Sequence, residues 1–433
     1  MKCSLIGVAP FLFAVHAAHG ASAIVAEVDS VYPQSEALYF DLHRNPELSS
    51  HETQTAAKLA AGLRELGYEV TTGVGGTGIV GVLKNGTGPV VMLRTELDAL
   101  PVEEKTGLPY ASTVRAKDDS GTEVGVMHAC GHDVHMASWM GAARIMASTR
   151  NRWRGTLVLI GQPAEETVSG AARMLADGLF TRFPRPRYAL AAHDDPRVPA
   201  GVVGYHAGPI LSNVDSLRIT IYGAGGHGAR PETTVDPIVI AARTVLALQT
   251  IVSREVSPFD SAVVTVGLLR GGTKNNIIPD EATLGLSVRS LTEPVRAHLL
   301  KAIERITKAE AAAAGAPREP RIERTEGTNA LINDPELTKR VTAALVRELG
   351  PKQVQDVPPE MASEDFSEFH GAGVPTLMLR VGATERSAFD AARKSGTELP
   401  SLHSPLFAPD REKTIKGMTT AEVIGLRELM PAK

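Results

Sequence analysis

In the first half of the chain, segments with the apolar periodicity of helices alternate with short apolar runs typical of strands, and this alternation predicts an α/β domain. Residues 35–49 and 51–67 place apolar side chains every three or four positions, as amphipathic helices do. Short β-branched runs then alternate with helical segments, which is typical of strands that pair in parallel. The pattern therefore predicts a mostly parallel sheet flanked by helices. The expected order is strands at 78–83 and 89–94, a helix at 133–148, a strand at 156–162, a helix at 169–180 and a strand at 188–193.

A different texture begins near Asn213 and predicts a second domain inserted into the first. A strand with alternating apolar and polar residues is followed by a long amphipathic helix, two more strands, a second helix and a last strand. This βαββαβ order is that of a small ferredoxin-like α+β domain, a lid or dimerisation domain with boundaries at 214–327. Residues 24–213 and 328–433 would form the larger domain, which a helix from near Asn333 and a buried strand at 374–383 complete.

The first 23 residues have the pattern of a secretory signal peptide. Lys2 forms a short positive region, residues 5–18 an apolar core, and small residues surround Ala23. We expect cleavage near Ala23 and a periplasmic or secreted protein. An uncleaved membrane anchor is the alternative, although the core is shorter than the roughly 20 residues that a membrane span needs. Because the two cysteines are Cys3 and Cys130, cleavage would leave one thiol and no internal disulfide.

Length and charge limit the possible partners. A chain of 433 residues is long enough for two buried cores. Its formal net charge is -4, and acidic and basic residues are interspersed, so nothing indicates binding to nucleic acid or to an anionic membrane. A small-molecule partner is favoured.

The densest group of metal-binding side chains is the segment MHACGHDVHMA, residues 127–137. Cys130 and His132 lie two residues apart, and on extended backbone this spacing points both side chains the same way. His128 and His135 are rival ligands, but we expect His135 in the first turn of the following helix, with Asp133 as the N-cap. We predict that Cys130 and His132 bind metal together. Ordinary strand-to-helix packing is the alternative.

Further candidate ligands follow the ends of predicted strands, where side chains from distant segments converge. Glu165 and Glu166 repel each other, so their adjacency calls for a cation, with one carboxylate as ligand and the other as general base. His193 ends one strand, and His403 lies in a proline-bounded loop after the last strand. Asp98 could orient a ligating histidine or act as a structural cap. Taken singly, a solvated glutamate pair or a surface histidine would be the simpler interpretation.

These ligand types indicate which metals the site would hold. Thiolate and imidazole ligands favour Zn2+ over Mg2+ or Ca2+, while the carboxylates leave Mn2+, Co2+ or Ni2+ possible. The pattern favours a hydrolytic enzyme with two divalent metal ions.

Several segments, spread over nearly the whole mature chain, resemble the motifs of one family. They are LHRNPELS, LRTELDALP, MHACGHDVHMA, GQPAEE, GAGGHGARP with the following DPI, GGTKNNIIPDEA, SEDFSEF and LHSPLF. Together they resemble the co-catalytic metallopeptidase family of aminoacylases, hippurate hydrolases and plant auxin-conjugate amidohydrolases, and the cysteine of ACGHD points to the amidohydrolase subfamily. The resemblance implies hydrolysis of the amide bond of N-acyl amino acids, such as hippurate or auxin conjugates, to a carboxylic acid and a free amino acid.

The resemblance also implies roles for single residues. Glu165 would be the general acid and base. His227 resembles a histidine that reaches the partner subunit's active site to polarise the scissile carbonyl, which implies a homodimer formed through the small domain. Asn276 and Arg289 resemble residues that hold the substrate, since the planar fork of an arginine suits a terminal carboxylate. The two cations would be bound by Cys130, His132, Glu166, His193 and His403.

Two positions depart from the family pattern. Gly228 stands where relatives have alanine, and Glu232 where relatives commonly have histidine. These departures affect contacts of the small domain rather than the metal site. The alternatives are a carboxypeptidase or dipeptidase of the same family, a catalytically silent metal-binding relative, and a periplasmic solute-binding module.

Overall fold

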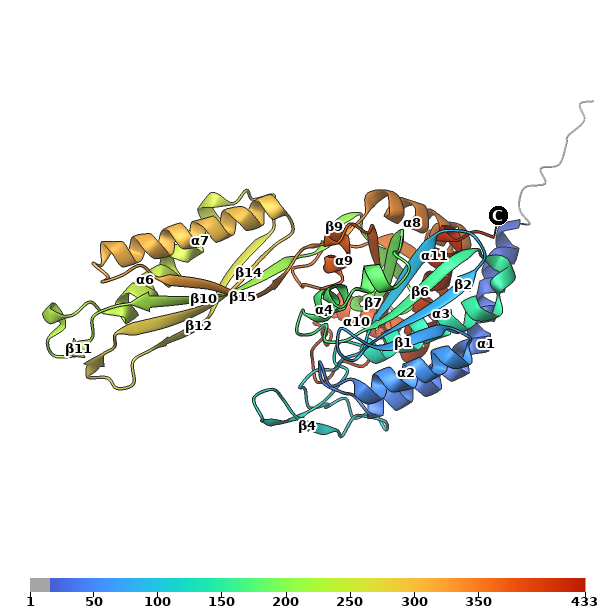
Figure 1. Cartoon of the computed structure of the whole chain (residues 1–433), viewed down its shortest axis with the longest axis horizontal. Coiled ribbons are helices and arrows are strands. Elements are labelled where there is room, and N and C mark those ends of the chain that lie inside the picture. Colours follow the sequence, from blue (N-terminus) through green and yellow to red (C-terminus); the bar gives the residue numbers. More distant parts are fainter. Residues whose placement is uncertain (1–15, 433) are drawn as a thin grey trace, which may run out of the picture.

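A computed structural model describes residues 16–432, which form two domains (Figure 1). The larger domain is an eight-stranded sheet between two layers of helices, and the smaller α+β domain extends from one side of it. The predicted fold class is thereby confirmed. Residues 1–15 of the predicted signal peptide lie outside the described part of the chain.

Parallel strands occupy the middle of the large sheet. β6, β3, β7 and β18 run parallel to one another. On one side β2 pairs antiparallel with β6 and β1 pairs antiparallel with β2, and on the other side β8 pairs antiparallel with β18. The central strands are continuous apolar runs because helices cover both faces of the sheet. In spatial order the strands are β1 (Glu69–Val74), β2 (Gly78–Asn85), β6 (Gly155–Gln162), β3 (Val90–Glu96), β7 (Tyr188–Pro199), β18 (Thr376–Thr384), β8 (Val203–Tyr205) and β17 (Val354–Asp356).

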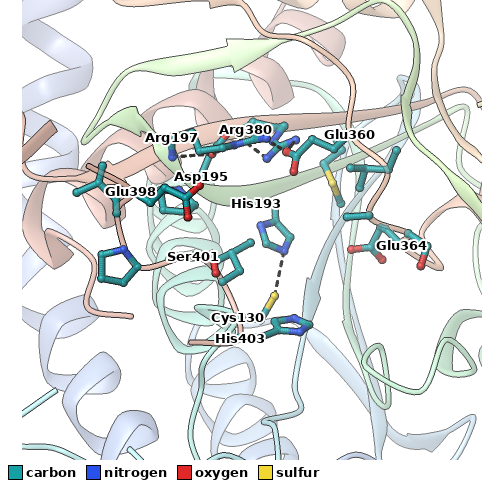
Figure 2. A pocket seen from close by; sticks show the side chains of 18 of the residues that line it. Cys130, His193, Asp195, Arg197, Glu360, Glu364, Arg380, Glu398, Ser401 and His403 are labelled. Atoms are coloured by element: carbon teal, nitrogen blue, oxygen red, sulfur yellow. Dashed lines mark hydrogen bonds and ion pairs between the residues drawn. The ribbon is translucent and has the colours of Figure 1, made fainter. Parts of the chain in front are cut away.

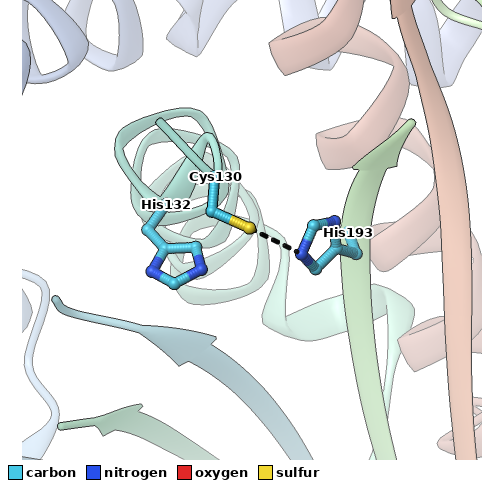
Figure 3. A group of neighbouring side chains, drawn as sticks. All are labelled: Cys130, His132 and His193. Atoms are coloured by element: carbon cyan, nitrogen blue, oxygen red, sulfur yellow. Dashed lines mark hydrogen bonds between the residues drawn. The ribbon is translucent and has the colours of Figure 1, made fainter. Parts of the chain in front are cut away.

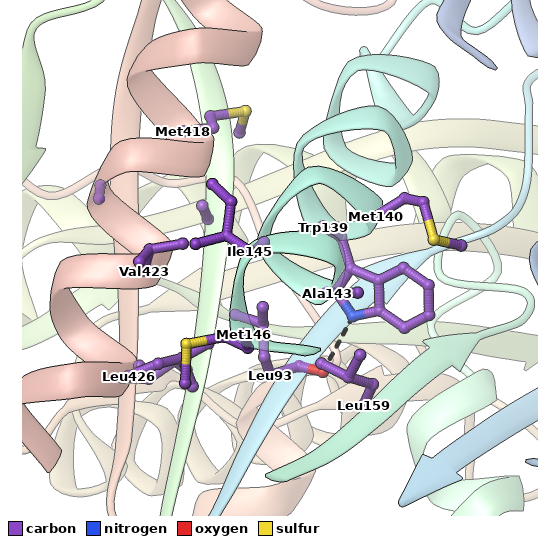
Figure 4. Packing of buried hydrophobic residues seen from close by; sticks show 14 of the residues in the cluster. Leu93, Trp139, Met140, Ala143, Ile145, Met146, Leu159, Met418, Val423 and Leu426 are labelled. Carbon is purple, nitrogen blue, oxygen red and sulfur yellow. Dashed lines mark hydrogen bonds between the residues drawn. The ribbon is translucent and has the colours of Figure 1, made fainter. Parts of the chain in front are cut away.

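Each face of the large sheet has its own hydrophobic core. In the first core, α3 and α11 pack side by side on one face of the sheet: Figure 4 shows Trp139 beside Leu93 of the sheet, and Met146 facing Leu426 of α11. The second core packs Phe369 against the opposite face. Helices of the first layer are α1 (His16–Arg44), α2 (Thr53–Glu65), α3 (His132–Ser148), α8 (Pro335–Leu349) and α11 (Arg411–Leu429), and those of the second are α4 (Gly170–Ala176), α5 (Leu179–Arg182) and α9 (Ser367–Gly371).

The small domain is a four-stranded antiparallel sheet with two helices on one face. Its strand order, β12-β14-β10-β15, puts the first and last strands of the domain side by side, as the βαββαβ pattern predicts. A further pair, β11 and β13, forms its tip. The elements are β10 (Asn213–Tyr222), β11 (Gly226–His227), α6 (Pro237–Thr250), β12 (Ala262–Gly271), β13 (Ile277–Ile278), β14 (Glu281–Ser290), α7 (Glu293–Ala313) and β15 (Arg321–Thr328).

Several short elements complete the chain. A π-helical turn at Ile251–Glu255 extends α6, and the resulting helix, Pro237–Glu255, is long and apolar enough to cross a membrane by length and composition. Its inner face, however, packs in the core of the small domain. The remaining short elements are β4 (Arg115–Lys117), β5 (Glu123–Gly125), β9 (Gly208–Leu211), β16 (Leu331–Asn333), and 3-10 turns at Arg150–Arg152 and Pro231–Thr233.

The first helix differs from the prediction. It was expected at 35–49, but α1 is longer at its start and ends at Arg44, just before Asn45 and Pro46. Proline disfavours helical backbone at the residue before it and removes a hydrogen bond, which fits an end before Pro46, although α1 accommodates Pro33 in its interior. Ile24 and Val28 are buried in the first core, so the residues directly after the predicted cleavage point belong to the folded domain.

Replacing Trp139 with alanine should lower the free energy of unfolding by about 3–5 kcal/mol, because the indole is fully buried and also donates a hydrogen bond to the backbone oxygen of Leu93. Chemical denaturation beside the wild type measures the loss. The control is Phe259→Ala: this ring is 97% exposed, so a change within about 0.5 kcal/mol is expected. Similar losses in both variants would contradict the core position of Trp139.

Candidate metal centre

A cavity of about 880 Å³ opens where the central strands of the large sheet end (Figure 2). Its walls come from the turn after β6, the ends of β7 and β18, and the segments 360–364 and 389–403. The small domain contributes Arg289. Cys130, Glu165, Glu166, His193 and His403 all line this cavity.

Cys130 lies in a turn and His132 is the first residue of α3, so the predicted extended backbone is wrong. The preceding β5 pairs with β4 in a separate hairpin rather than in the large sheet. Gly131 has a φ of 74°, a left-handed conformation that favours glycine. A Cβ there would lie 2.3 Å from Oδ2 of Asp194, so only glycine fits the turn that brings the two side chains together.

Asp133 does not occupy the N-cap position as predicted; Gly131 does. The Asp133 carboxylate accepts a hydrogen bond from the backbone of Val134 and lies 2.6 Å from Nδ1 of His43, whose Nε2 is 3.2 Å from Glu104. Burial lowers the pKa of His43, but the two carboxylates outweigh this and raise it to about 10. A charged His43 thus ties α1 to the start of α3.

His193 faces Cys130 across the cavity floor (Figure 3). The prediction that the strand ends at His193 is wrong: β7 runs on to Pro199, so Asp194 and Asp195 lie on it. Sγ of Cys130 is 3.6 Å from Nε2 of His193. Tetrahedral zinc, with bonds of about 2.3 Å to sulfur and about 2.0 Å to nitrogen, holds such atoms about 3.6 Å apart. The spacing therefore suits ligands of one ion.

Glu165 and Glu166 lie in a turn directly after β6. Ala164 and Val168, which flank them, have φ values of 50° and 52°. One carboxylate oxygen of each glutamate lies 3.9 Å from Nε2 of His132. The tight turn therefore directs both carboxylates toward the same imidazole.

His403 reaches the cluster from the C-terminal loop. Its backbone N–H donates to the oxygen of Ala129 at 2.8 Å, and its Nε2 is 3.4 Å from Oε2 of Glu166. Of the groups whose ligand atoms lie within 4.8 Å of one another, three overlapping ones consist only of predicted ligands and Glu165, an arrangement that could hold two neighbouring ions. They are Cys130 with His132 and His193, Cys130 with Glu166 and His403, and His132 with Glu165 and Glu166.

His132 and His193 are each oriented by a hydrogen bond from Nδ1, the ring nitrogen that points away from the cluster. Nδ1 of His132 donates to the backbone oxygen of Asp98, and Nδ1 of His193 to that of Asp194, each at 2.8 Å. Such bonds leave Nε2 available to a metal. Nε2 of His132 is buried and has no hydrogen-bond partner among the described residues. Because buried polar atoms are rarely left unpaired, a cation fits this position.

Asp98 and His135 support the cluster from behind. The Asp98 carboxylate accepts a hydrogen bond from the Ser49 hydroxyl at 2.6 Å and from the backbone of Glu166 at 3.0 Å, so it holds the glutamate turn as well as the histidine. His135, a rival ligand by sequence, is engaged by Glu96 at 3.0 Å and by Asp194 at 3.2 Å. The other rival, His128, is buried, and burial lowers its pKa to about 4.

Negative charge is crowded in the cluster. Burial raises the pKa of the Cys130 thiol well above its usual range, and Glu166 and Glu165 raise it further. The pKa of Glu165 is also well above normal because of burial, Glu364 and Glu166. Without a counterion, the ionised forms of these groups are disfavoured. A pair of cations would remove that penalty, so the donor set fits two divalent ions.

Two networks of ion pairs contain residues for which the sequence predicted no function. Arg94, fully buried on β3, pairs with Glu96 and lies 2.6 Å from Glu364 and 3.3 Å from Asp365. The sequence does contain a signal for the first network: an arginine inside the apolar run VVMLR needs buried acidic partners, and the acidic pair of SEDFSEF supplies them. Arg380, opposite His193 on the next strand, belongs to the second network, which lines the cavity wall.

The three residues of the small domain that were predicted to act at the active site lie in two different places. Arg289 lines the cavity, and its Nη1 donates to the backbone oxygen of Met361 at 2.8 Å. His227 and Asn276 are exposed and meet at the tip, where the backbone N–H of Gly228 donates to the oxygen of Asn276 at 2.9 Å. Within one chain the tip lies at the far end of the small domain (Figure 1).

The two-domain α/β fold and the cluster of thiol, imidazole and carboxylate groups at the sheet edge are those of a metal-dependent hydrolase. Residues 92–395 match the model of peptidase family M20/M25/M40, so the chain belongs to this family and is an enzyme that hydrolyses amide bonds. The family resemblance inferred from the motifs is confirmed.

Individual relatives cover most of the chain. It is 38% identical to hippurate hydrolase of Campylobacter jejuni over 80% of this chain and 87% of that protein. It is 36% identical to N-acetyl-L-cysteine deacetylase of Bacillus subtilis over 76% of this chain and 75% of that protein. A solved structure of a Bacillus subtilis protein, described as a dinuclear metal-binding peptidase of family M20, has a TM-score of 0.74, 28% identity, and coverage of 92% and 98%.

Zinc binding to the metal-free protein should release protons at pH 7, because burial and the neighbouring glutamates raise the pKa of the Cys130 thiol and keep it protonated until a cation binds. Calorimetric titration in two buffers of different ionisation enthalpy measures the number released. Cys130→Ser should release about one proton fewer, since a serine hydroxyl carries no comparable acidity. Binding without proton release would contradict the charge crowding.

Proposed function

We propose that the protein hydrolyses N-acyl amino acids to a carboxylic acid and a free amino acid, using two divalent cations. The observation that carries the proposal is the position of Glu165, which lies beside five potential metal ligands and faces the same cavity as Arg289. The ligands would be Cys130, His132, Glu166, His193 and His403, and Asp98 would orient His132. Zn2+ suits this donor set best, and Mn2+, Co2+ or Ni2+ are compatible.

Glu165 would move the protons of the reaction. When bound, the cations would lower the pKa of an attacking water from 15.7 to about 7 and polarise the amide carbonyl. Glu165 would accept the proton of this water and pass it to the departing amine nitrogen.

Arg289 would bind the carboxylate of the amino acid. Arg197 and Arg380, which also line the cavity, are already paired with acidic side chains. The contacts of Arg289 are a backbone oxygen and the Ser287 hydroxyl, so its charge is not neutralised by a carboxylate among the described residues. A substrate carboxylate would supply that charge partner.

His227 would act in the active site of a second copy of the chain, with Asn276 beside it. The exposed face of α6 supports a homodimer through the small domain, because Val239 is 55% and Leu246 72% exposed there. The neighbouring β12 is an edge strand, which offers unpaired backbone groups to another chain. A periplasmic or secreted location, after cleavage near Ala23, completes the proposal.

Purified zinc-loaded protein should hydrolyse N-acyl amino acids faster than dipeptides, and a chelator should stop it. Glu165→Gln should lose at least about 100-fold in kcat with unchanged metal content, because the proton acceptor is gone while the ligands remain. Release of the free amino acid and elemental analysis measure both effects. Glu336→Gln, an exposed change on α8, is the matched control. Faster cleavage of dipeptides, or normal turnover by Glu165→Gln, would refute the proposal.

Two inactive variants should restore activity when combined. In a dimer of Glu165→Gln with His227→Ala, one site has both its own Glu165 and the His227 of the partner subunit. Random mixing of the refolded chains should therefore recover roughly a quarter of wild-type activity. Adding Leu246→Asp to both chains should abolish the recovery, since a charge would face the apolar interface. Full activity of His227→Ala alone would remove this residue from the reaction.

A further inference from the structure

One wall of the cavity is a helix that belongs to neither core. The segment after β18 forms α10 (Arg386–Ser395), and residues 396–402 then lead to His403. No residue of α10 is buried. The helix is held at its ends: the Glu385 carboxylate accepts a hydrogen bond from the backbone of Ala388 at 3.0 Å, and Gly396 closes the other end with a φ of 71°.

The inner side of this segment presents apolar groups to the cavity. Phe389 and Ala392 lie three residues apart on one side of α10, and Leu399 and Leu402 follow in the returning loop. Leu402 also packs against Phe407 in a small core cluster. Phe389 and Leu399 are half-buried and belong to no core cluster of the described residues. Burying them against an apolar ligand would therefore be favourable.

Four charged side chains of the cavity, two acids and two arginines, neutralise one another, whereas the exposed Arg393 and Glu398 add one charge of each sign to this wall. Asp195 lies 3.0 Å from Arg380 and 3.2 Å from Arg197, and Glu360 pairs with both arginines (Figure 2). Two acids thus balance two bases. The cavity volume of about 880 Å³ lies in the upper part of the range of about 300–1,000 Å³ that holds drug-sized ligands. An acetyl group would leave much of this space empty.

The two ends of a substrate would lie on opposite sides of the metal ligands. Figure 2 shows Glu364 and Glu398 on either side of His193. Arg289 contacts the segment of Glu364 through the backbone of Met361, so a carboxylate bound by Arg289 would lie on that side. The other end of the substrate, its acyl group, would then point toward the segment of Glu398.

We propose that α10 and residues 397–402 form the acyl-group pocket, and that Phe389 and Leu399 select bulky apolar acyl groups, such as benzoyl, over acetyl. The inference rests on the proposed function and defines its substrate class. Phe389 and Leu399 are specificity-determining residues: they contact the acyl group and take no part in proton transfer. Their effect should therefore depend on the size of the acyl group.

The test compares kcat/KM for N-benzoyl and N-acetyl derivatives of one amino acid. Wild-type enzyme should prefer the benzoyl substrate by at least about tenfold, because a pocket that buries even one extra methylene gains about that factor. Phe389→Ala should lose about tenfold on the benzoyl substrate and less than about twofold on the acetyl substrate. Phe389→Leu should recover much of the loss. Lys394→Ala, on the same helix but outside the cavity, should change neither.

The outcomes separate the two proposals. Hydrolysis of both substrates at similar kcat/KM, or equal losses on both in Phe389→Ala, would overturn the acyl pocket and leave the amidohydrolase function standing. Hydrolysis of neither substrate would overturn the function and the pocket with it. Because α10 has no buried residue, Phe389→Ala should keep the wild-type melting temperature, and this measurement excludes misfolding as the cause of a loss.

Discussion

The crowding of buried acidic groups at one edge of the large sheet is the constraint on which the site depends. Two like charges about 4 Å apart repel by roughly 4 kcal/mol at an effective dielectric constant of about 20. A domain has only about 5–15 kcal/mol of stability in total. Cys130, Glu165 and Glu166 can therefore be ionised together only if cations balance them. Hydrogen bonds from Nδ1 of His132 and His193 to the backbone oxygens of Asp98 and Asp194 leave the Nε2 atoms of both rings available to such cations.

The two domains divide the chemistry between them. The sheet edge of the large domain gathers the proposed ligands and the proposed proton acceptor, whereas the small domain contributes Arg289 to the cavity. His227 and Asn276 meet at the tip although 49 positions of sequence separate them, because β11 and β13 pair there. A single copy of the chain thus carries all the predicted groups but does not bring them all to one cavity.

The sequence predicted the sheet, the inserted domain and the composition of the site, because strand periodicity and the ends of parallel strands follow general rules. The sequence could not predict the backbone conformation of the segments that carry the site residues. Cys130 and His132 were assigned an extended spacing, but the left-handed Gly131 turns the chain at the start of α3. Periodicity contains no signal for such a turn. Nor could it show that β7 would continue past His193, since its pairing with β18 extends the strand.

The cavity wall and His403 are joined in one segment of the chain, and this affects how the substrate preference of the enzyme could evolve. α10 and His403 lie in one short segment between β18 and α11. An insertion or deletion that reshaped the cavity wall would therefore also shift His403, a candidate ligand of the two metal ions. Point substitutions at Phe389 or Leu399 carry no such burden, because these side chains support no core. Evolution of new substrate preferences would therefore proceed more easily by exchanging side chains along this connection than by altering its length.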